Sequence, residues 1–291
     1  MESENEPGTP QRFAFGKNWR RFLEHVDEER IAAAEDSLRR LLRREELIGA
    51  TFLDIGCGSG LFSLAARQLG AQRVHSFDFD TQSVACAREL RRRFEQTRPF
   101  KDESWEEGAE EKLSGWTIER GDILDAEYRD RLPVADVVYS WGVLHHTGHM
   151  WRALEAAAEL VAPEGLLCIA IYNQQPFLTG YWKVVKRLYN RLPGPLAWCL
   201  SGAYYLFSSS VLFVVDLLRG RSPLARHRGA GPRGMNHYHD VVDWIGGWPF
   251  EAAKPEEIFR FFRDRGFTLQ ELTTCGGRHG CNEFLFRRHG S

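Results

Sequence analysis

The chain has 291 residues, a hydrophobic content of 43% and a formal net charge of −2 at pH 7. This apolar content is enough to bury a sizeable core, and the length fits one large domain or two small ones. The near-neutral charge provides no overall field that would draw the protein to nucleic acid.

The cysteines and the N-terminus bear on the cellular compartment. Six cysteines are scattered without C-x-x-C spacing, so the sequence predicts neither a zinc site of that type nor a disulfide framework. The first residues, MESENEPGTP, are acidic and contain Pro and Gly, the reverse of a signal peptide. We therefore expect a cytoplasmic protein whose first ten residues are disordered.

Residues 1–48 are expected to form a tail and a helical arm ahead of the first strand. An amphipathic helix is predicted to start after Asp27, a good N-cap residue. Phe13, Phe15 and Trp19 either anchor this arm or close over a ligand pocket. The apolar stripe of the helix consists of Ile31, Ala34, Leu38, Leu41 and Leu42.

The most informative stretch is residues 51–60, TFLDIGCGSG, followed by the apolar-periodic LFSLAARQLG. The first part predicts a buried strand, and the second predicts a helix that begins near Ser59. Gly56, Gly58 and Gly60 then occupy the turn between them, where the backbone approaches a ligand closely and the helix N-terminus offers N–H groups. The spacing differs from the G-x-G-x-x-G of pyrophosphate binders, which favours a ligand without a diphosphate.

Four further strands follow at intervals, with helices between them. RVHSF leads to Asp78, which lies 18 residues after Gly60, close to the position where an acidic side chain holds ribose hydroxyls in doubly wound sheets. Asp80 is expected to cap the next helix. WTIER, ADVVYS and LLCIAIYN are the remaining strands of this part, and the polar stretch 98–115 is expected to be a solvated loop.

The alternation of strands and helices predicts an α/β fold with a doubly wound, Rossmann-like sheet and right-handed crossovers. Residues 49–173 would form the ligand-binding core. Residues 254–291 would supply the last helix and a closing β-hairpin, because Pro255 starts a helical pattern that Gly266 ends. Residues 174–253 would form a helical segment between these two parts.

These motifs resemble the class I S-adenosylmethionine-dependent methyltransferases. The resemblance rests on LDIGCGSG at 53–60, RVHSFDFD at 73–80, GDIL at 121–124 and DVVYSWGVLHH at 136–146. Within this superfamily, the sequence most resembles the type 11 and quinone-biosynthesis O-methyltransferases, through the DIGCGSG and VLHH stretches. The resemblance implies a seven-stranded sheet and S-adenosyl-L-methionine as the cofactor. Compared with the family pattern, residues 174–253 would be a helical insertion that caps the pocket of the methyl acceptor.

The resemblance also implies which residues hold the cofactor. Asp78 would accept hydrogen bonds from both ribose hydroxyls, Asp122 would take the adenine amino group, and Ile123 would lie against the ring. The remaining residues of the expected cofactor site are Asp54, Gly56, Cys57, Gly58, Gly60, Phe79, Ser140 and Trp141.

Candidates for proton removal from an acceptor are His145 and His146, because they follow the fourth strand at its carboxyl end. A purely structural role is an equal alternative for each. Tyr238 and His239 form a second pair of candidate catalytic residues, beside Asp240. His237, His239 and Asp240 give only a weak metal signal, and no metal is expected.

Within the insertion, residues 198–218 are mostly apolar, and the segment is long enough to span a membrane as a helix. Polar positions and a stripe at three- and four-residue spacing favour an amphipathic helix packed on the enzyme. The alternative is weak contact with a membrane surface, aided by neighbouring basic residues. The stripe consists of Leu200, Tyr204, Phe207, Val211, Val214 and Leu218, and the basic residues are Lys183, Lys186, Arg187, Arg219 and Arg221.

The sequence therefore predicts a methyltransferase of a small-molecule acceptor with an O-, N- or S-nucleophile, and no nucleic-acid partner. Two alternatives stay open: a macromolecular acceptor, RNA or protein, and a non-catalytic cofactor-binding module. Arg88, Arg91, Arg92, Arg93 and Arg98 would offer a basic face to RNA, although interleaved glutamates favour a solvated helix. The acceptor's identity and the oligomeric state do not follow from the sequence.

Overall fold

A computed structural model describes residues 26–97, 115–220, 237–276 and 280–290. The predictions for the first ten residues, for Phe13, Phe15 and Trp19, and for the loop 98–115 fall almost wholly outside these ranges. The chain divides into two compact units, which we describe separately. One contains residues 176–250, and the other contains the described residues up to 175 and from 251 onward.

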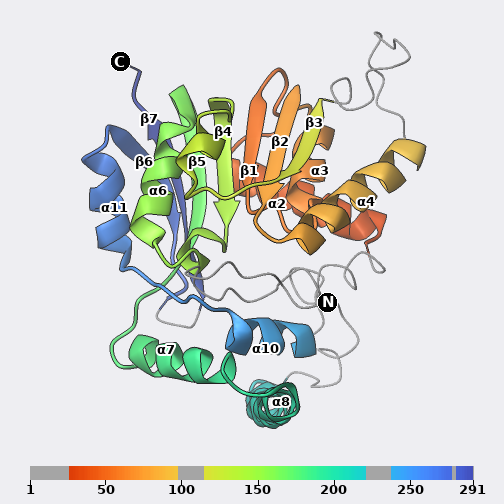
Figure 1. The fold of residues 1–291 in the computed structure, drawn as a ribbon, viewed down its shortest axis with the longest axis vertical. Helices are drawn as coiled ribbons and strands as arrows, with labels where there is room; N and C mark the ends of the chain where they lie inside the picture. The colour runs from red at the N-terminus through yellow and green to blue at the C-terminus, as the bar shows by residue number, and fades with distance from the viewer. Residues whose placement is uncertain (1–25, 98–114, 221–236, 277–279, 291) are drawn as a thin grey trace. The chain divides into compact units, whose positions relative to one another are not determined.

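The larger unit contains a seven-stranded sheet in the order β3-β2-β1-β4-β5-β7-β6 (Figure 1). Strands β1 to β5 are parallel to one another, whereas β7 is antiparallel to both β5 and β6. This arrangement confirms the predicted doubly wound α/β fold with a closing hairpin. The strands are β1 (Thr51–Ile55), β2 (Arg73–Asp78), β3 (Trp116–Arg120), β4 (Ala135–Trp141), β5 (Val161–Tyr172), β6 (Phe267–Thr273) and β7 (Cys281–Arg288).

Alternate residues of the strands supply two cores, one on each face of the sheet. Leu53 and Ile55 of β1 belong to the cluster that includes Leu154 and Phe262, whereas Phe52 points the other way and stacks on Tyr139. The helices of this unit are α2 (Glu28–Leu42), α3 (Leu61–Gln68), α4 (Thr81–Thr97), α5 (Ala126–Arg129), η1 (Leu144–His146), α6 (Met150–Glu159) and α11 (Pro255–Arg263).

Helix α2 forms as predicted. The side chain of Asp27 accepts a hydrogen bond from the backbone N–H of Arg30 at 2.9 Å and so caps the first turn. The buried positions are Ala34, Leu38, Leu41 and Leu42, which are members of the predicted stripe.

Two boundaries differ from the predictions. Helix α3 begins at Leu61 instead of near Ser59, because Gly60 is its N-cap with a left-handed backbone. Strand β5 begins at Val161, five residues before the predicted strand LLCIAIYN, so residues 162–165 lie within it. They form an irregularity between the pairs Ala135↔Val161 and Val137↔Leu166, with Glu164 at φ 61°.

The two ends of the insertion lie side by side in the larger unit. Asn173 and Ala253 form a parallel β-bridge, and the backbone N–H of Gln174 donates to the carbonyl of Ala253 at 3.0 Å. The N–H of Ala253 donates in turn to the carbonyl of Tyr172 at 3.1 Å. We call this pairing the neck of the insertion.

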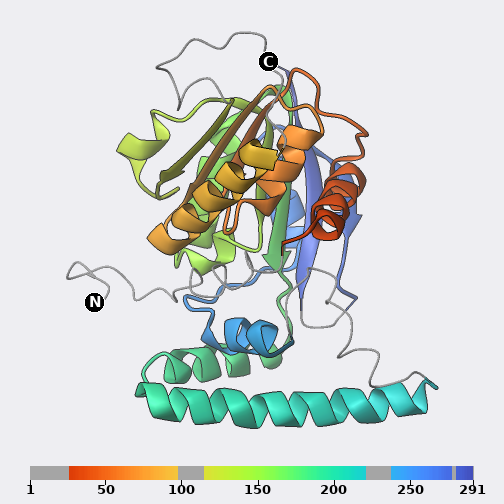
Figure 2. The same cartoon turned by 90° about the vertical axis from the view of Figure 1, so that its right-hand side faces the viewer.

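The smaller unit is helical and contains α7 (Leu178–Tyr189), α8 (Gly194–Leu218) and α10 (His237–Gly246). Figure 2 shows α8 as a long helix that extends past α7 and α10. The prediction that the apolar stripe of α8 packs inward is wrong. Phe207 is 65% exposed and Leu218 is 83% exposed, whereas the buried residues of α8 are Ser201 and Asp216.

A chain of buried hydrogen bonds joins three strands and a helix of the larger unit. The indole N–H of Trp116 on β3 donates to Ser76 Oγ on β2 at 2.8 Å, and Ser76 donates to Ser63 Oγ on α3 at 2.7 Å. Ser63 donates in turn to the carboxylate of Asp54 on β1. All four side chains are buried. Such a chain is stabilising only while every member keeps its partner.

Replacement of Ser76 tests this chain. Ser76→Ala should lower the free energy of unfolding by about 1–3 kcal/mol, because the buried Trp116 N–H loses its acceptor. Ser83→Ala is the matched control. Ser83 is also buried, but in the described part of the chain its hydroxyl has no hydrogen-bond partner. Urea denaturation should show a loss for Ser76→Ala and none for Ser83→Ala, and equal losses would contradict the role of the chain.

Candidate functional site

The predicted glycine turn lies between β1 and α3, and all three glycines have positive φ. The values are 75° for Gly56, 54° for Gly58 and 79° for Gly60. The backbone N–H groups of Gly56 and Cys57 both donate to the carbonyl of Phe77 on β2, at 2.8 and 3.0 Å. The turn is therefore held against the end of the neighbouring strand.

Two of the glycines are required by packing within the protein. A Cβ on Gly56 would lie 2.3 Å from Cγ1 of Val143, and a Cβ on Gly60 would lie 2.8 Å from Cβ of Ala87. We had expected all three glycines to serve the approach of a ligand. At Gly56 and Gly60, glycine is also required because the neighbouring segments leave no room for a side chain.

Asp78 ends β2 and faces this turn. One carboxylate oxygen accepts from the backbone N–H of Gly58 at 2.9 Å, and the other accepts from the N–H of Asp80 at 2.8 Å. Asp80 caps α4 as predicted, because its side chain accepts from the N–H of Gln82 at 2.8 Å. A carboxylate has about four lone-pair sites, so Asp78 can organise the turn and still accept hydrogen bonds from a ligand.

Asp54 and Asp78 are two carboxylates at the ends of adjacent strands. Burial, opposed by the Ser63 hydrogen bond and reinforced by the charge of Asp78, raises the pKa of Asp54 to about 7. Burial likewise raises the pKa of Asp78 to about 6, despite the bonds from Asp80 and Gly58. Among the described residues neither carboxylate forms a salt bridge, so a cationic ligand would compensate the charge.

Cys57 lies in the turn with its side chain buried. Burial, together with the charges of Asp54 and Asp78, raises the pKa of its thiol well above the usual value. Because the thiolate is the nucleophilic form of cysteine, this side chain is unreactive and serves as a small apolar group beside the turn.

The next strand ends contribute the residues expected near a nucleoside. Asp122 follows β3, and its side chain accepts from the N–H of Leu124 at 2.9 Å, which fixes the loop. Ile123 is buried beside it. Phe79 follows Asp78, and the guanidinium of Arg120 lies 5.6 Å from its ring centroid. These side chains lie at the carboxyl edge of the sheet, as predicted.

The two predicted residues of β4 are engaged in contacts within the sheet. The hydroxyl of the buried Ser140 donates to the carbonyl of Ile55 at 3.0 Å, which ties β4 to the start of the glycine turn. The indole N–H of Trp141 donates to Glu283 of β7 at 2.8 Å. Sequence reasoning did not identify Glu283, which lies 142 residues away.

His145 and His146 occupy η1, beyond the end of β4, and the preceding residue Val143 packs against Gly56. His145 is fully buried, and its Nδ1 accepts from the backbone N–H of Tyr172 at 3.4 Å. The ring also packs on that of Tyr172, with centroids 3.9 Å apart. This geometry favours the structural alternative for His145. His146 is half-buried and stands nearer to solvent.

Tyr238 and His239 lie in the first turn of α10, and their side chains are outside the described residues. The same holds for the weak metal signal at His237, His239 and Asp240. Within the described ranges, no group of three or more His, Cys, Asp or Glu residues is arranged to hold a metal ion.

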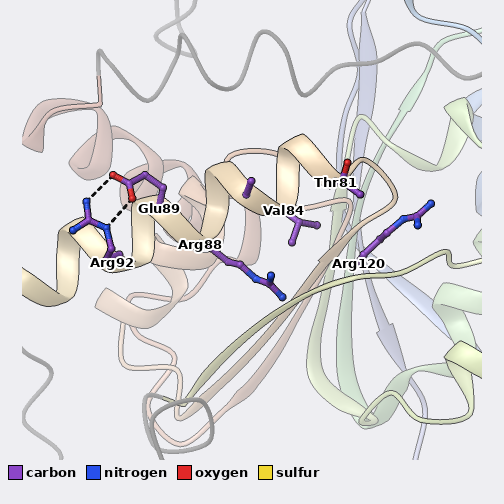
Figure 3. Close-up of a pocket in the computed structure, with 7 residues that line it drawn as sticks. Thr81, Val84, Arg88, Glu89, Arg92 and Arg120 are labelled. Carbon is purple, nitrogen blue, oxygen red and sulfur yellow. Dashed lines mark hydrogen bonds and ion pairs between the residues drawn. The ribbon is translucent and has the colours of Figure 1, made fainter. Parts of the chain in front are cut away.

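A shallow pocket of about 460 Å³ lies along α4, outside the glycine turn (Figure 3). It contains three of the basic residues of this region, Arg88, Arg92 and Arg120. Arg88 donates to the carbonyl of Ile118 at 2.9 Å, and Arg92 pairs with Glu89 at 2.8 Å. These arginines are engaged with the protein's own carbonyls and carboxylates, as the interleaved charges predicted.

The site as a whole lies where the direction of strand connection reverses, between β1 and β4. Ligands in open α/β sheets bind in the crevice at this point, beyond the carboxyl ends of the strands. Here that end of the sheet offers a glycine turn, backbone N–H groups, the buried Asp54, the part-buried Asp78, and two further groups at Asp122 and Ile123. The set fits S-adenosylmethionine, which combines a nucleoside with a cationic sulfonium.

Comparison with known proteins agrees with this geometry. A profile of the methyltransferase-domain family matches residues 24–207. The ubiquinone biosynthesis O-methyltransferase of Xanthomonas euvesicatoria is 25% identical over 230 residues, or 79% of this chain and 67% of that protein. A ribosomal protein L11 methyltransferase of Photobacterium profundum is 42% identical over 45 residues, only 16% of this chain and 15% of that protein.

Two solved structures share the fold. The magnesium protoporphyrin IX methyltransferase of Synechocystis, solved with bound S-adenosylhomocysteine, has a TM-score of 0.50 at 16% identity, over 94% of this chain and 93% of that one. The [4+2]-cyclase SpnF has a TM-score of 0.51 at 10% identity, over 88% of this chain and 80% of that one. The likeness concerns the fold alone.

The raised pKa of Asp78 predicts how cofactor affinity depends on pH. A carboxylate that accepts from ribose hydroxyls binds best when ionised. The affinity for S-adenosylhomocysteine should therefore rise with pH, by about tenfold per unit below pH 6, and level off above about pH 7. Isothermal titration calorimetry at several pH values measures this.

Asp78→Asn is the control for this profile. It keeps an oxygen for the Gly58 N–H but cannot ionise, so its affinity should be lower at pH 8 and nearly independent of pH below it. A wild-type profile that is flat between pH 5 and 7 would contradict the assignment of Asp78 to the ligand.

Proposed function

This chain belongs to the S-adenosylmethionine-dependent methyltransferase family, and from that premise we propose that it transfers a methyl group from the cofactor to a small-molecule acceptor. The acceptor atom would be an oxygen, nitrogen or sulfur. The observation that carries the proposal is the pairing of the glycine turn with two carboxylates, the buried Asp54 and the part-buried Asp78, at the switch point of the sheet.

The main task of the protein in this reaction is to align the methyl group of the cofactor with the acceptor atom. The bound cofactor supplies a methyl group on a sulfonium, whose sulfur leaves as a thioether when a nucleophile attacks in line. Positioning two reactants in this way is itself a large part of the rate enhancement. Asp78 would hold the ribose hydroxyls, while Asp122 and Ile123 would bind the adenine. The two carboxylates would also favour the cationic cofactor over its neutral product.

The extent of the sequence matches supports a small acceptor. The similarity to an O-methyltransferase of ubiquinone biosynthesis extends over 230 residues, whereas the similarity to the L11 methyltransferases is confined to fewer than 50. A short match of that length is compatible with a shared cofactor motif. The engaged arginines of α4 also give no support to an RNA acceptor.

The second candidate is a methyltransferase with a protein acceptor, since the local matches are to enzymes named for a ribosomal protein. A single assay distinguishes the two. Purified protein and radiolabelled methyl donor are added to a cell extract, and the label is then measured in the acid-soluble, protein and RNA fractions. Label in the acid-soluble or solvent-extractable fraction is the expected result.

The control is Asp78→Ala, which should give at least about tenfold less label in every fraction at a cofactor concentration below the dissociation constant. A hydrogen bond to a charged group contributes about 1.5–3 kcal/mol, so its loss weakens binding by roughly tenfold or more. Label that enters only protein or RNA with the wild type would refute the small-molecule acceptor.

The two neighbouring histidines should differ in their effects. His146→Ala should lower methyl transfer by at least about tenfold without changing cofactor affinity, because general acid–base groups contribute roughly 10²–10⁴ in rate. His145→Ala should instead destabilise the fold by about 2–5 kcal/mol, since it empties a fully buried site.

Steady-state kinetics and thermal melting of the two variants separate these roles. Full turnover in His146→Ala would remove it from catalysis. An unchanged melting temperature in His145→Ala would contradict its structural role.

A further inference from the structure

The outward face of α7 is apolar along its whole length. Phe177, Tyr181, Val184 and Leu188 recur at three- and four-residue spacing and form one stripe, and all four are exposed, Phe177 to 95% and Val184 to 68%. The opposite stripe of the helix is buried and consists of Trp182, Lys186 and Tyr189. Apolar residues therefore occupy both faces of α7.

Helix α8 has the reverse of the polarity expected for a helix exposed to water. Its inward side buries Ser201 and Asp216 and half-buries Ser208 and Ser209. Its outward side is almost entirely apolar. The exposed residues there include Leu206, Phe207, Phe213, Val214, Leu217 and Leu218. A contiguous apolar surface of this kind marks a site of contact with a membrane or with another protein.

The inward faces of the helices are already packed against one another. Trp182 of α7 contacts Tyr204 of α8 and Trp244 of α10, with ring centroids 5.5 and 5.1 Å apart. Lys186 donates to the carbonyl of Trp244, and its ammonium lies 4.9 Å from the ring centroid of Phe250. The sequence suggested Lys186 as a basic surface residue, and its burial corrects this.

The charge of the insertion is opposite to that of the whole chain. Residues 174–253 contain nine Lys and Arg residues and four acidic residues, Asp216, Asp240, Asp243 and Glu251, while the whole chain has a net charge of −2. Lys183 and Arg187 are exposed and lie one turn apart on α7, beside its apolar stripe, and Arg191 is exposed just after the helix; we call these three residues the basic row. An apolar surface flanked by cations is complementary to a bilayer that contains anionic lipids.

Helix α8, with 25 residues, is about 37 Å long and on length and composition alone is a candidate membrane span. The neck argues against a single crossing. Asn173 and Ala253 are paired, so the chain must leave and return on the same side of any bilayer. No second span is found among the described residues, and residues 221–236 carry four arginines.

We propose that the outward faces of α7 and α8 dock in the plane of a bilayer surface that contains anionic lipids. The apolar side chains enter the boundary between headgroups and acyl chains, and the basic row contacts the lipid phosphates. Exposed Tyr181 and Trp198 suit this boundary, where aromatic side chains with a polar atom are enriched. This inference does not depend on the acceptor or on methyl transfer.

Flotation of the full-length protein with vesicles tests the proposal. Vesicles of phosphatidylcholine with phosphatidylglycerol should retain the protein, and vesicles of phosphatidylcholine alone should retain much less. Phe207→Glu/Val214→Glu should lower retention at least about tenfold, because it places two carboxylates in the apolar boundary. Arg187→Glu/Arg191→Glu should weaken binding to anionic vesicles by about fivefold or more for each arginine.

The matched control is Ile48→Glu/Val134→Glu, the same change at two exposed apolar residues of the larger unit. It should leave retention unchanged. Cys199 provides a second readout, because it is an exposed free thiol on α8. Its reaction with a polar maleimide should slow when anionic vesicles are present.

Three outcomes would overturn the proposal. The first is no retention on either kind of vesicle, and the second is equal retention of the wild type and Phe207→Glu/Val214→Glu. The third is a dimer in sedimentation experiments that this double variant dissociates while vesicles retain nothing, which would identify the surface as a contact between two copies of the chain.

Discussion

Two carboxylates at the ends of neighbouring parallel strands, the buried Asp54 and the part-buried Asp78, constrain the centre of the larger unit. Asp54 is held through Ser63 and Ser76 to Trp116, so that β1, β2, β3 and α3 share one hydrogen-bonded chain. Asp78 holds the N–H of Gly58 and so fixes the turn that follows β1. The fold and the ligand site therefore depend on the same groups. Loss of solvent raises the pKa of both carboxylates, and a bound cation would stabilise their ionised forms.

The sheet and the cofactor side of the site were largely predictable from the sequence, because their signals are local. Strands buried on both faces read as apolar runs, and glycines with positive φ mark the turn that follows the first of them. Asp78 was identified because an acidic residue about 20 positions beyond the glycines holds the ribose in doubly wound sheets, and Asp122 was identified through the family resemblance. The order of the last strands was not predictable, since nothing local shows that β7 lies between β5 and β6.

Contacts between distant residues and the environment of a helix face escaped prediction. Trp116 reaches Ser76 and Trp141 reaches Glu283 across 40 and 142 residues, and no periodic pattern indicates such pairs. For α8, the periodicity located an apolar stripe but could not show what covers it. We assumed the protein core, whereas the inward side is the one that carries serines and Asp216. Periodicity identifies the apolar face of a helix, but it does not show whether that face contacts the protein core, a partner or a membrane.

The neck at Asn173 and Ala253 allows the insertion to vary in length and sequence independently of the sheet. The pairing holds the two ends of the excursion together within the larger unit, whatever chain runs between them. Closing a longer loop costs little, about 0.6 kcal/mol for each doubling of its length. An ancestor could therefore exchange, lengthen or lose this segment while β5, α11 and β7 stayed in register. Sequence change in this segment can therefore leave the part of the sheet that binds the cofactor intact.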